Sequence, residues 1–255
     1  SSNNVDLDSF IQQVNEINKS QKSDNSKNID NNDYWDKSFG KFIFSIGTSK
    51  LLDYPVRNLS IEINKEQSNY YLNTGKATFP GNTNISFEGL FKNKFSIFEG
   101  GGSLESENIR DFYRWLSKDL NNISDSRLKK ARINSEVVFR KGGATFAGIS
   151  GKIDSSNING EVRLRFGDLT SAFVNLKIDS LNLDPYLDKN ENSEDNDLNK
   201  IDLLNFDVIN FDIQLENLLM FKNKYSDIIF KNTYKNNIFI IDQLDILDFA
   251  GGELK

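Results

Sequence analysis

The sequence predicts a mainly β protein: a long, curled antiparallel sheet of groove-like, repetitive form, with one amphipathic helix near residues 106–120. Three observations support this prediction. Apolar and polar residues alternate over most of the chain, Gly and Asn clusters interrupt the alternation, and one segment changes to helical spacing. A closed β-sandwich requires the same alternation, so it stays open as the alternative architecture.

Period-two alternation marks the strands, because successive side chains of a strand point to opposite faces of the sheet. Val174, Leu176 and Ile178, for example, alternate with Asn175 and Lys177. The residues expected on the apolar face, which would line a groove if the sheet is open, are Phe42, Phe44, Ile46, Leu59, Ile61, Ile85, Phe87, Val162, Leu164, Phe166, Val174, Leu176 and Ile178. The glycine and asparagine clusters that predict turns between strands are Gly100-Gly101-Gly102, Gly142-Gly143 and Asn236-Asn237.

Residues 106–120 follow the spacing of a helix instead. Ile109, Phe112, Leu116 and Leu120 recur on one helical face, which we expect to pack on the sheet, with Ser106 as the N-cap. A helix of this length covers only a small part of a long sheet. The remaining apolar face must therefore meet a second sheet, curl onto itself or contact an apolar ligand.

The composition excludes several classes of function. The chain has 255 residues with no His and no Cys, which removes disulfides, the usual zinc ligands and all catalysis by imidazole. Its net charge of −6 argues against a nucleic-acid partner. No calcium-loop or phosphate-loop spacing is present, and nothing marks a particular pair of carboxylates. We therefore expect no catalytic residue, no metal and no cofactor.

Two polar stretches, 12–33 and 188–200, read as linkers, and a similar motif precedes each of them. The motif is Val5 to Ile11 in the first case and Leu181-Asn182-Leu183-Asp184-Pro185-Tyr186-Leu187 in the second. We interpret residues 1–33 as the end of one repeat plus a linker, 34–187 as a complete repeat, 188–200 as an acidic linker and 201–255 as the start of a further repeat. The chain shows neither a signal peptide nor a long apolar run, so we expect targeting or anchoring segments outside it.

The segment from Ile158 to Leu187 resembles the AsmA family, in which a "G-x-apolar-x-apolar" strand precedes a strand that ends in a Leu-Asp-Leu-Asp-Pro-Tyr-Leu motif. The helical segment from Ile109 to Leu116 is similar to that family's Leu-Arg-Asp-Phe-x-x-Trp-Leu pattern. The Phe-Pro-Gly-Asn-Thr turn at 79–83 and the Gly-Gly pair at 251–252 are similar as well. Asn182 stands where the family commonly has Asp.

The resemblance implies a non-enzymatic module of the Gram-negative envelope. Such proteins are anchored in the inner membrane, project into the periplasm and support outer-membrane biogenesis and phospholipid passage. The implied partner is a phospholipid or other acyl-chain lipid held along an apolar β-groove. Two alternatives stay open: a periplasmic scaffold for outer-membrane protein assembly without lipid transfer, and, more distantly, a hydrolase that uses carboxylates.

Overall fold

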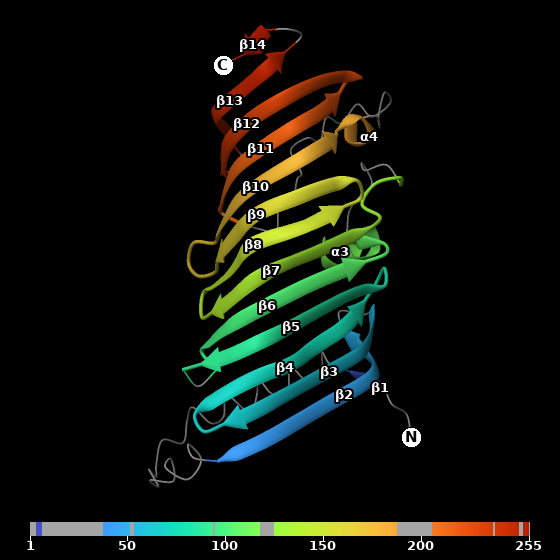
Figure 1. Cartoon of the computed structure of the whole chain (residues 1–255), viewed down its shortest axis with the longest axis vertical. Helices are drawn as coiled ribbons and strands as arrows, with labels where there is room; N and C mark the ends of the chain where they lie inside the picture. The colour runs from blue at the N-terminus through green and yellow to red at the C-terminus, as the bar shows by residue number, and fades with distance from the viewer. Residues whose placement is uncertain are drawn as a thin grey trace.

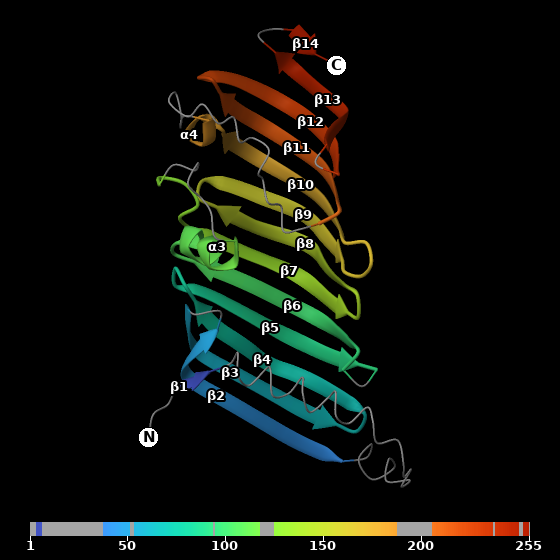
Figure 2. The ribbon, with the colours of Figure 1, turned by 180° about the vertical axis from the view of Figure 1, so that it is seen from behind.

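In the computed structural model the chain forms one sheet of 14 strands, which follow one another in sequence order from β1 to β14 (Figures 1 and 2). The structure describes residues 4–6, 38–51, 54–93, 95–117, 125–187, 206–236, 238–249 and 252–254. β1 and β14 are the two ends of the sheet, which does not close on itself. The prediction of a mainly β, curled and open sheet is therefore confirmed, and the closed sandwich is not what forms.

The strands and helices have the following bounds: β1 (Asn4–Asp6), β2 (Phe39–Leu51), β3 (Tyr54–Glu66), β4 (Asn69–Phe79), β5 (Thr83–Lys92), β6 (Ile97–Ser106), α3 (Ile109–Ser117), β7 (Ala131–Arg140), β8 (Gly143–Ile153), β9 (Ser156–Arg165), β10 (Ser171–Asn182), α4 (Asp184–Leu187), β11 (Val208–Met220), β12 (Asn223–Lys235), β13 (Ile238–Phe249) and β14 (Gly252–Leu254).

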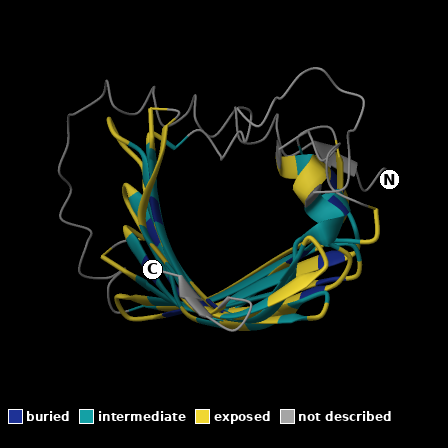
Figure 3. Cartoon of the chain, turned by 90° about the horizontal axis from the view of Figure 1, so that it is seen from above, coloured by how far each residue is buried: buried dark blue, intermediate teal, exposed yellow. Residues whose placement is uncertain are grey.

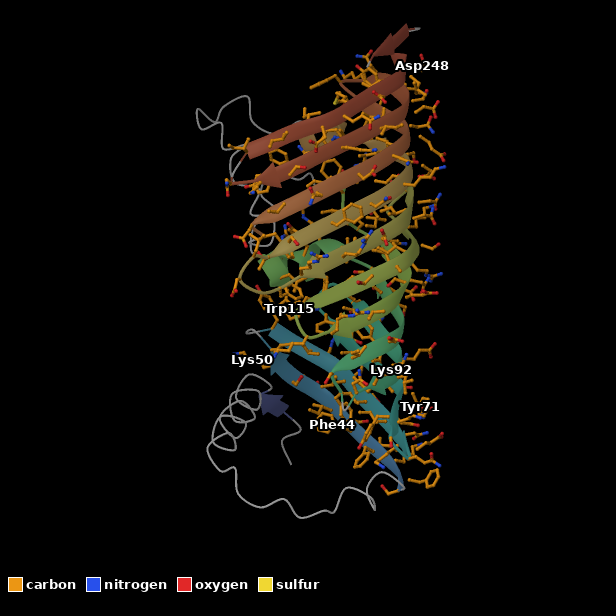
Figure 4. The ribbon with its side chains drawn as sticks, turned by 90° about the vertical axis from the view of Figure 1, so that its left-hand side faces the viewer. Phe44, Lys50, Tyr71, Lys92, Trp115 and Asp248 are labelled. Carbon is orange, nitrogen blue, oxygen red and sulfur yellow. The ribbon has the colours of Figure 1, made fainter. Side chains whose placement is uncertain are left out.

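The sheet is bent into a trough that is U-shaped when it is seen from above, with α3 inside one arm (Figure 3). Phe79 of β4 contacts Phe112 and Trp115 of α3, so the face that carries Phe79 is the concave one. Figure 4 shows the same division from the side: Tyr71 and Lys92 project from the convex face, whereas Phe44 and Trp115 lie on the other side.

Bulges and glycines account for the bend. β4, β8 and β13 each contain a bulge, because each has one residue more than its neighbour between two successive paired positions. A bulge bends its strand and increases the local twist. Neighbouring backbones also approach closely at Gly89, Gly100 and Gly160, where an added Cβ would lie 2.0–2.3 Å from a carbonyl oxygen of the next strand.

One predicted turn is wrong. Gly100-Gly101-Gly102 lies in the middle of β6, where Gly100 faces Gly89 of β5 and Val137 of β7. These glycines serve close packing of strands rather than chain reversal. The turns predicted at Gly142 and Asn236 are present between β7 and β8 and between β12 and β13, and both residues have positive φ.

Two strand pairs are parallel, although the sequence predicted an antiparallel sheet throughout. β1 pairs with β2, and β10 pairs with β11 along Ser171–Asn182, with parallel register. A parallel pair needs a crossover connection. The connection after β10 begins with α4, a short helix that the strand-like reading of this segment missed.

The helix α3 forms inside the predicted range but docks differently. Asn108 precedes the helix and occupies the cap position. Its backbone carbonyl accepts a hydrogen bond from the N–H of Asp111, and its side-chain amide donates one to the Asp111 carboxylate. Ser106 instead belongs to β6, is buried and hydrogen-bonds Thr83. Leu116, predicted to be packed, is 51% exposed. Leu120 lies outside the described residues.

The strand bounds recur at a constant offset. β2 begins at residue 39 and β11 at 208, β3 at 54 and β12 at 223, β4 at 69 and β13 at 238, and β5 at 83 and β14 at 252, each pair 169 residues apart. Left-handed backbone recurs at the same spacing, at Asn58 and Asp227 and at Gln67 and Asn236. The division of the chain into repeats stays a prediction, and both proposed linkers, 12–33 and 188–200, lie outside the described residues.

The first prediction concerns the parallel junction between β10 and β11. If a protease recognition sequence is placed within 188–200 and cleaved, the two pieces should stay together, because the ladder from Ser171 to Asn182 holds them. Size-exclusion chromatography in native buffer, followed by denaturing electrophoresis, should give one peak with two fragments. Two separate native peaks would show that the chain divides into independent units at this point.

The second prediction concerns the docking of α3. Phe112→Ala should destabilise the fold by about 1–3 kcal/mol, less than the roughly 3–5 kcal/mol for a fully buried Phe, because Phe112 is half-buried against Phe79 and Trp115. Leu116→Ala, on the same helix, should cost less than about 0.5 kcal/mol. Urea unfolding followed by circular dichroism measures both. Equal costs would mean that Phe112 does not anchor the helix.

Candidate functional site

Two rows of side chains run along the floor of the concave face, because directly paired residues of neighbouring strands share a face. We name the first row A; it consists of Leu72, Gly89, Gly100, Val137, Phe146, Val162, Val174, Phe211, Asn232 and Ile241. We name the second row B; it consists of Gly75, Phe87, Gly102, Ser135, Ile149, Gly160, Leu176, Ile213, Phe230 and Leu244, in which Ser135 and Ile149 meet at the register shift between β7 and β8 and the other neighbours are direct pairs. The bulges of β4, β8 and β13 fall between the two rows.

The structure brings most of the predicted groove residues into this face. Phe44, Ile61 and Phe87 align through Gly75, and Ile178 aligns with Ile158 of β9 and Leu215 of β11. The predicted residues that lie in paired positions of the concave face are Phe42, Phe44, Ile46, Leu59, Ile61, Ile85, Phe87, Val162, Leu164, Val174, Leu176 and Ile178. Phe166 differs: it follows β9 in a turn, is 51% exposed and stacks on Phe206.

Much of the concave face is open. Phe42 and Phe44 are 59% and 47% exposed. Among the described elements, the two helices lie towards one rim of the trough and no second sheet faces it (Figures 2 and 3). Exposed apolar side chains gathered on one face are typical of a binding surface.

An aromatic hollow of about 610 Å³ lies near the hairpin turns of β5–β6 and β7–β8. Its walls include Phe87, Phe91, Phe95, Phe98 and Phe139. The rings of Phe91 and Phe98 lie 5.1 Å apart, and those of Phe98 and Phe139 lie 6.0 Å apart. The volume falls within the range of about 300–1,000 Å³ that is common for small-molecule sites.

Of these residues the sequence reasoning identified only Phe87. The signal that could have found the others is a register: Phe91 lies directly opposite Phe98, and Phe98 opposite Phe139. The glycines that were read as a turn separated these segments and concealed the pairing. Once β6 is recognised as a single strand, the three phenylalanines fall side by side.

The Leu181 to Leu187 motif joins strands and does not line the hollow. The N–H of Leu183 donates to the carbonyl of Leu219, and the Asp184 carboxylate accepts the N–H of Lys222 in the turn between β11 and β12. The Asn182 amide oxygen accepts the N–H of Asp184, and Pro185 has no N–H to satisfy in the first turn of α4. The motif thus ends β10 and fixes it to the next hairpin.

Tyr186 of the motif lies beside a charged loop at the rim that carries both helices. The Asp154 carboxylate accepts three backbone N–H groups, from Leu128, Lys129 and Lys130, at 2.7–3.0 Å. Burial raises the pKa of Tyr186, the negative charge of Asp154 raises it further, and Arg127 opposes them. Tyr186 therefore stays protonated at neutral pH, and Asp154 organises the loop.

The convex face is polar and paired across strands. Hydrogen bonds from Lys41 and Asn73 lower the pKa of Glu62. Burial raises the pKa of Asp179, but hydrogen bonds from Asn157 and Ser180 outweigh it and lower the pKa overall. Glu62 and Asp179 are thus charged and hydrogen-bonded, which suits a surface in water.

Within the described ranges, no cluster of three or more Asp or Glu side chains could hold a metal ion. None of the helices in those ranges is long and apolar enough to cross a membrane. What the arrangement offers chemically is an elongated apolar surface with polar rims. Such a surface can bind molecules with long hydrocarbon parts.

The chain was compared with family models, with curated proteins and with solved structures, and no match was found in any of the three.

Proposed function

We propose that this chain is a non-enzymatic lipid-binding module that holds or conducts acyl chains along its concave face. The observation that carries the proposal is the combination of an unclosed sheet with rows A and B, in which apolar side chains from β4 to β13 share one face, with glycines, Ser135 and Asn232 between them. Such rows in a sandwich would meet a second sheet, whereas here the described elements leave the face open (Figure 3).

The energetics favour hydrocarbon on this face. Burial of apolar surface stabilises a complex by roughly 25 cal/mol per Å². Side chains such as Phe44, which is 47% exposed, leave much of that stabilisation unused in the free protein. The rows also run across all strands between β3 and β13, so a ligand could shift along them without leaving the apolar surface.

The resemblance to the AsmA family supports a cellular location for this function. On that basis the module belongs to an inner-membrane-anchored protein of the periplasm, works in outer-membrane biogenesis and takes phospholipid as its ligand.

A second candidate, a periplasmic scaffold for outer-membrane proteins, is favoured by one observation. β13 pairs with β14 only near Ile246 and Phe249, so Ile238, Phe239, Ile240 and Ile241 present an exposed, apolar edge. A strand from another protein could add to such an edge by β-augmentation. This candidate needs no lipid.

Leu176 in row B provides the test. Leu176→Asp should reduce the lipid that co-purifies with the protein at least fivefold while most of the β-structure persists, because a charge on an open face can stay hydrated when no lipid is present. Asn175→Asp, the neighbouring position on the convex face, is the matched control and should leave the lipid content unchanged. Native mass spectrometry with lipid extraction, and circular dichroism, measure the two quantities on the same samples.

Two results would contradict the proposal. One is a wild-type protein that carries no lipid and binds none when offered phospholipid vesicles. The other is equal lipid loss in both variants, which would mean that the concave face has no special role.

A further inference from the structure

The hairpins β2–β3 and β11–β12 have the same register, 169 residues apart. Phe39 lies opposite Glu66 in the first hairpin, and their counterparts Val208 and Lys235 lie opposite each other in the second. The correspondence continues along both hairpins to the turn at their far end. The outer edges of β2 and β11 are therefore equivalent surfaces for a further strand.

These two equivalent edges are covered to different extents. β10 lies parallel to β11 along almost its whole length, from Val208 to Leu219. β1 lies parallel to β2 only at residues 48–50, which are the counterparts of the last three positions that β10 covers. Among the residues that the structure describes, no strand pairs with the remaining part of this edge, residues 39–47, at the end of the sheet (Figure 1).

Side chains on this uncovered part of β2 are exposed where their counterparts on β11 are not. Phe42 and Phe44 are exposed, whereas their counterparts Phe211 and Ile213 are half-buried beside β10. On the convex side Ile43 is 64% exposed. An edge strand that presents apolar side chains and unpaired backbone groups is a template for the addition of another strand.

We propose that the edge of β2 at residues 39–47 binds an extended apolar strand of a partner polypeptide, which runs parallel to β2 in the register that β10 adopts on β11. In that register the partner places apolar side chains beside Phe42 and Phe44, as β10 places Val174 and Leu176 beside their counterparts. Because Phe42 and Phe44 align with rows A and B through β3, the bound strand extends both rows. This inference goes beyond the lipid-binding function and does not depend on it.

The partner strand differs from β10 at one position on the convex side. The counterpart of Ile43 on β11 is Asp212, which lies opposite the polar side chain of Asn175. Side chains that lie directly opposite each other stabilise a sheet when they are chemically matched. The strand that fits β2 therefore carries an apolar residue opposite Ile43, where β10 carries an amide.

Synthetic peptides with the sequence of β10, residues 171–182, are the probes, and fluorescence anisotropy on the full chain measures their binding. The peptide with Asn175→Ile should bind about fivefold more tightly than the unchanged β10 peptide, because its isoleucine matches Ile43. A peptide of the same composition in which the apolar alternation is disrupted should bind about tenfold more weakly than the unchanged peptide, since it cannot keep its apolar side chains on one face.

Ile43→Lys in the protein should weaken the unchanged β10 peptide about tenfold, because a charged side chain on an edge strand opposes strand addition. The peptide with Asn175→Glu should recover most of that loss on this variant, since the two opposite charges then lie directly across the pair. Lys177→Glu in the peptide changes the charge more but lies opposite Ser45, so it should recover less. Circular dichroism checks that the variant is folded.

The matched control is Ile240→Lys, which places the same charge at a residue that is 50% exposed on β13, at the other end of the sheet. This variant should leave peptide binding unchanged. The orientation is measured between spin labels, one on the first residue of the peptide and one on a single cysteine at either end of β3, Glu66→Cys or Tyr54→Cys, in a chain that has no other cysteine. A parallel strand places the peptide label closer to residue 66 than to residue 54.

Three results would overturn the proposal. The first is that none of the β10 peptides binds the wild-type protein. The second is that Ile240→Lys abolishes binding while Ile43→Lys does not, which would place the peptide on β13. The third is a peptide label closer to residue 54, which would mean an antiparallel strand. The lipid content of the wild-type protein is independent of each of these results.

Discussion

The strand register is the constraint on which this molecule depends. Side chains alternate between faces with a period of two, so a slip of one residue would move the whole apolar set of a strand to the other face. The ladder keeps apolar residues on the concave side through successive strands, as in the line from Val162 through Val174 to Phe211. The open face, the aromatic hollow and the polar convex surface all follow from this alignment.

The bulges preserve that alignment where simple alternation would lose it. Leu72 and Gly75 are three residues apart and would point to opposite faces of a regular strand, yet both pair with concave residues of β5. Phe146 and Ile149 of β8 behave in the same way towards β9. An extra residue in each strand restores the parity of the pattern and bends the strand at the same point.

The sequence was sufficient for the mainly β class, for most of the concave face and for the existence of α3, because these depend on periodicity that is local in the chain. Periodicity did not separate the open sheet from a closed sandwich, since both require the same alternation. It was insufficient where a long-range contact decides. Gly100 reads as a turn residue until the neighbouring strand is placed, where Glu88 and Gly89 leave no room for a Cβ at this position. Leu116 has the right helical spacing for packing, but the sheet lies under Phe112 and Trp115.

The same limit applied to the aromatic hollow and to the parallel junction of β10 and β11. The hollow joins Phe91, Phe98 and Phe139 from three strands, and only the register between these strands reveals it. The parallel pairing depends on the path of the chain after Leu187. By contrast, the motif around Asp184 was recognised from the sequence alone. In the structure it connects the end of β10 to the turn between β11 and β12.

The row of bulges has a mechanical consequence. In a closed barrel, strand number and stagger fix the diameter. An unclosed sheet has no such condition, and in β4, β8 and β13 the strands bend between the same two rows. Small changes in backbone angle along this crease would change the width of the trough while the hydrogen bonds between strands remain intact.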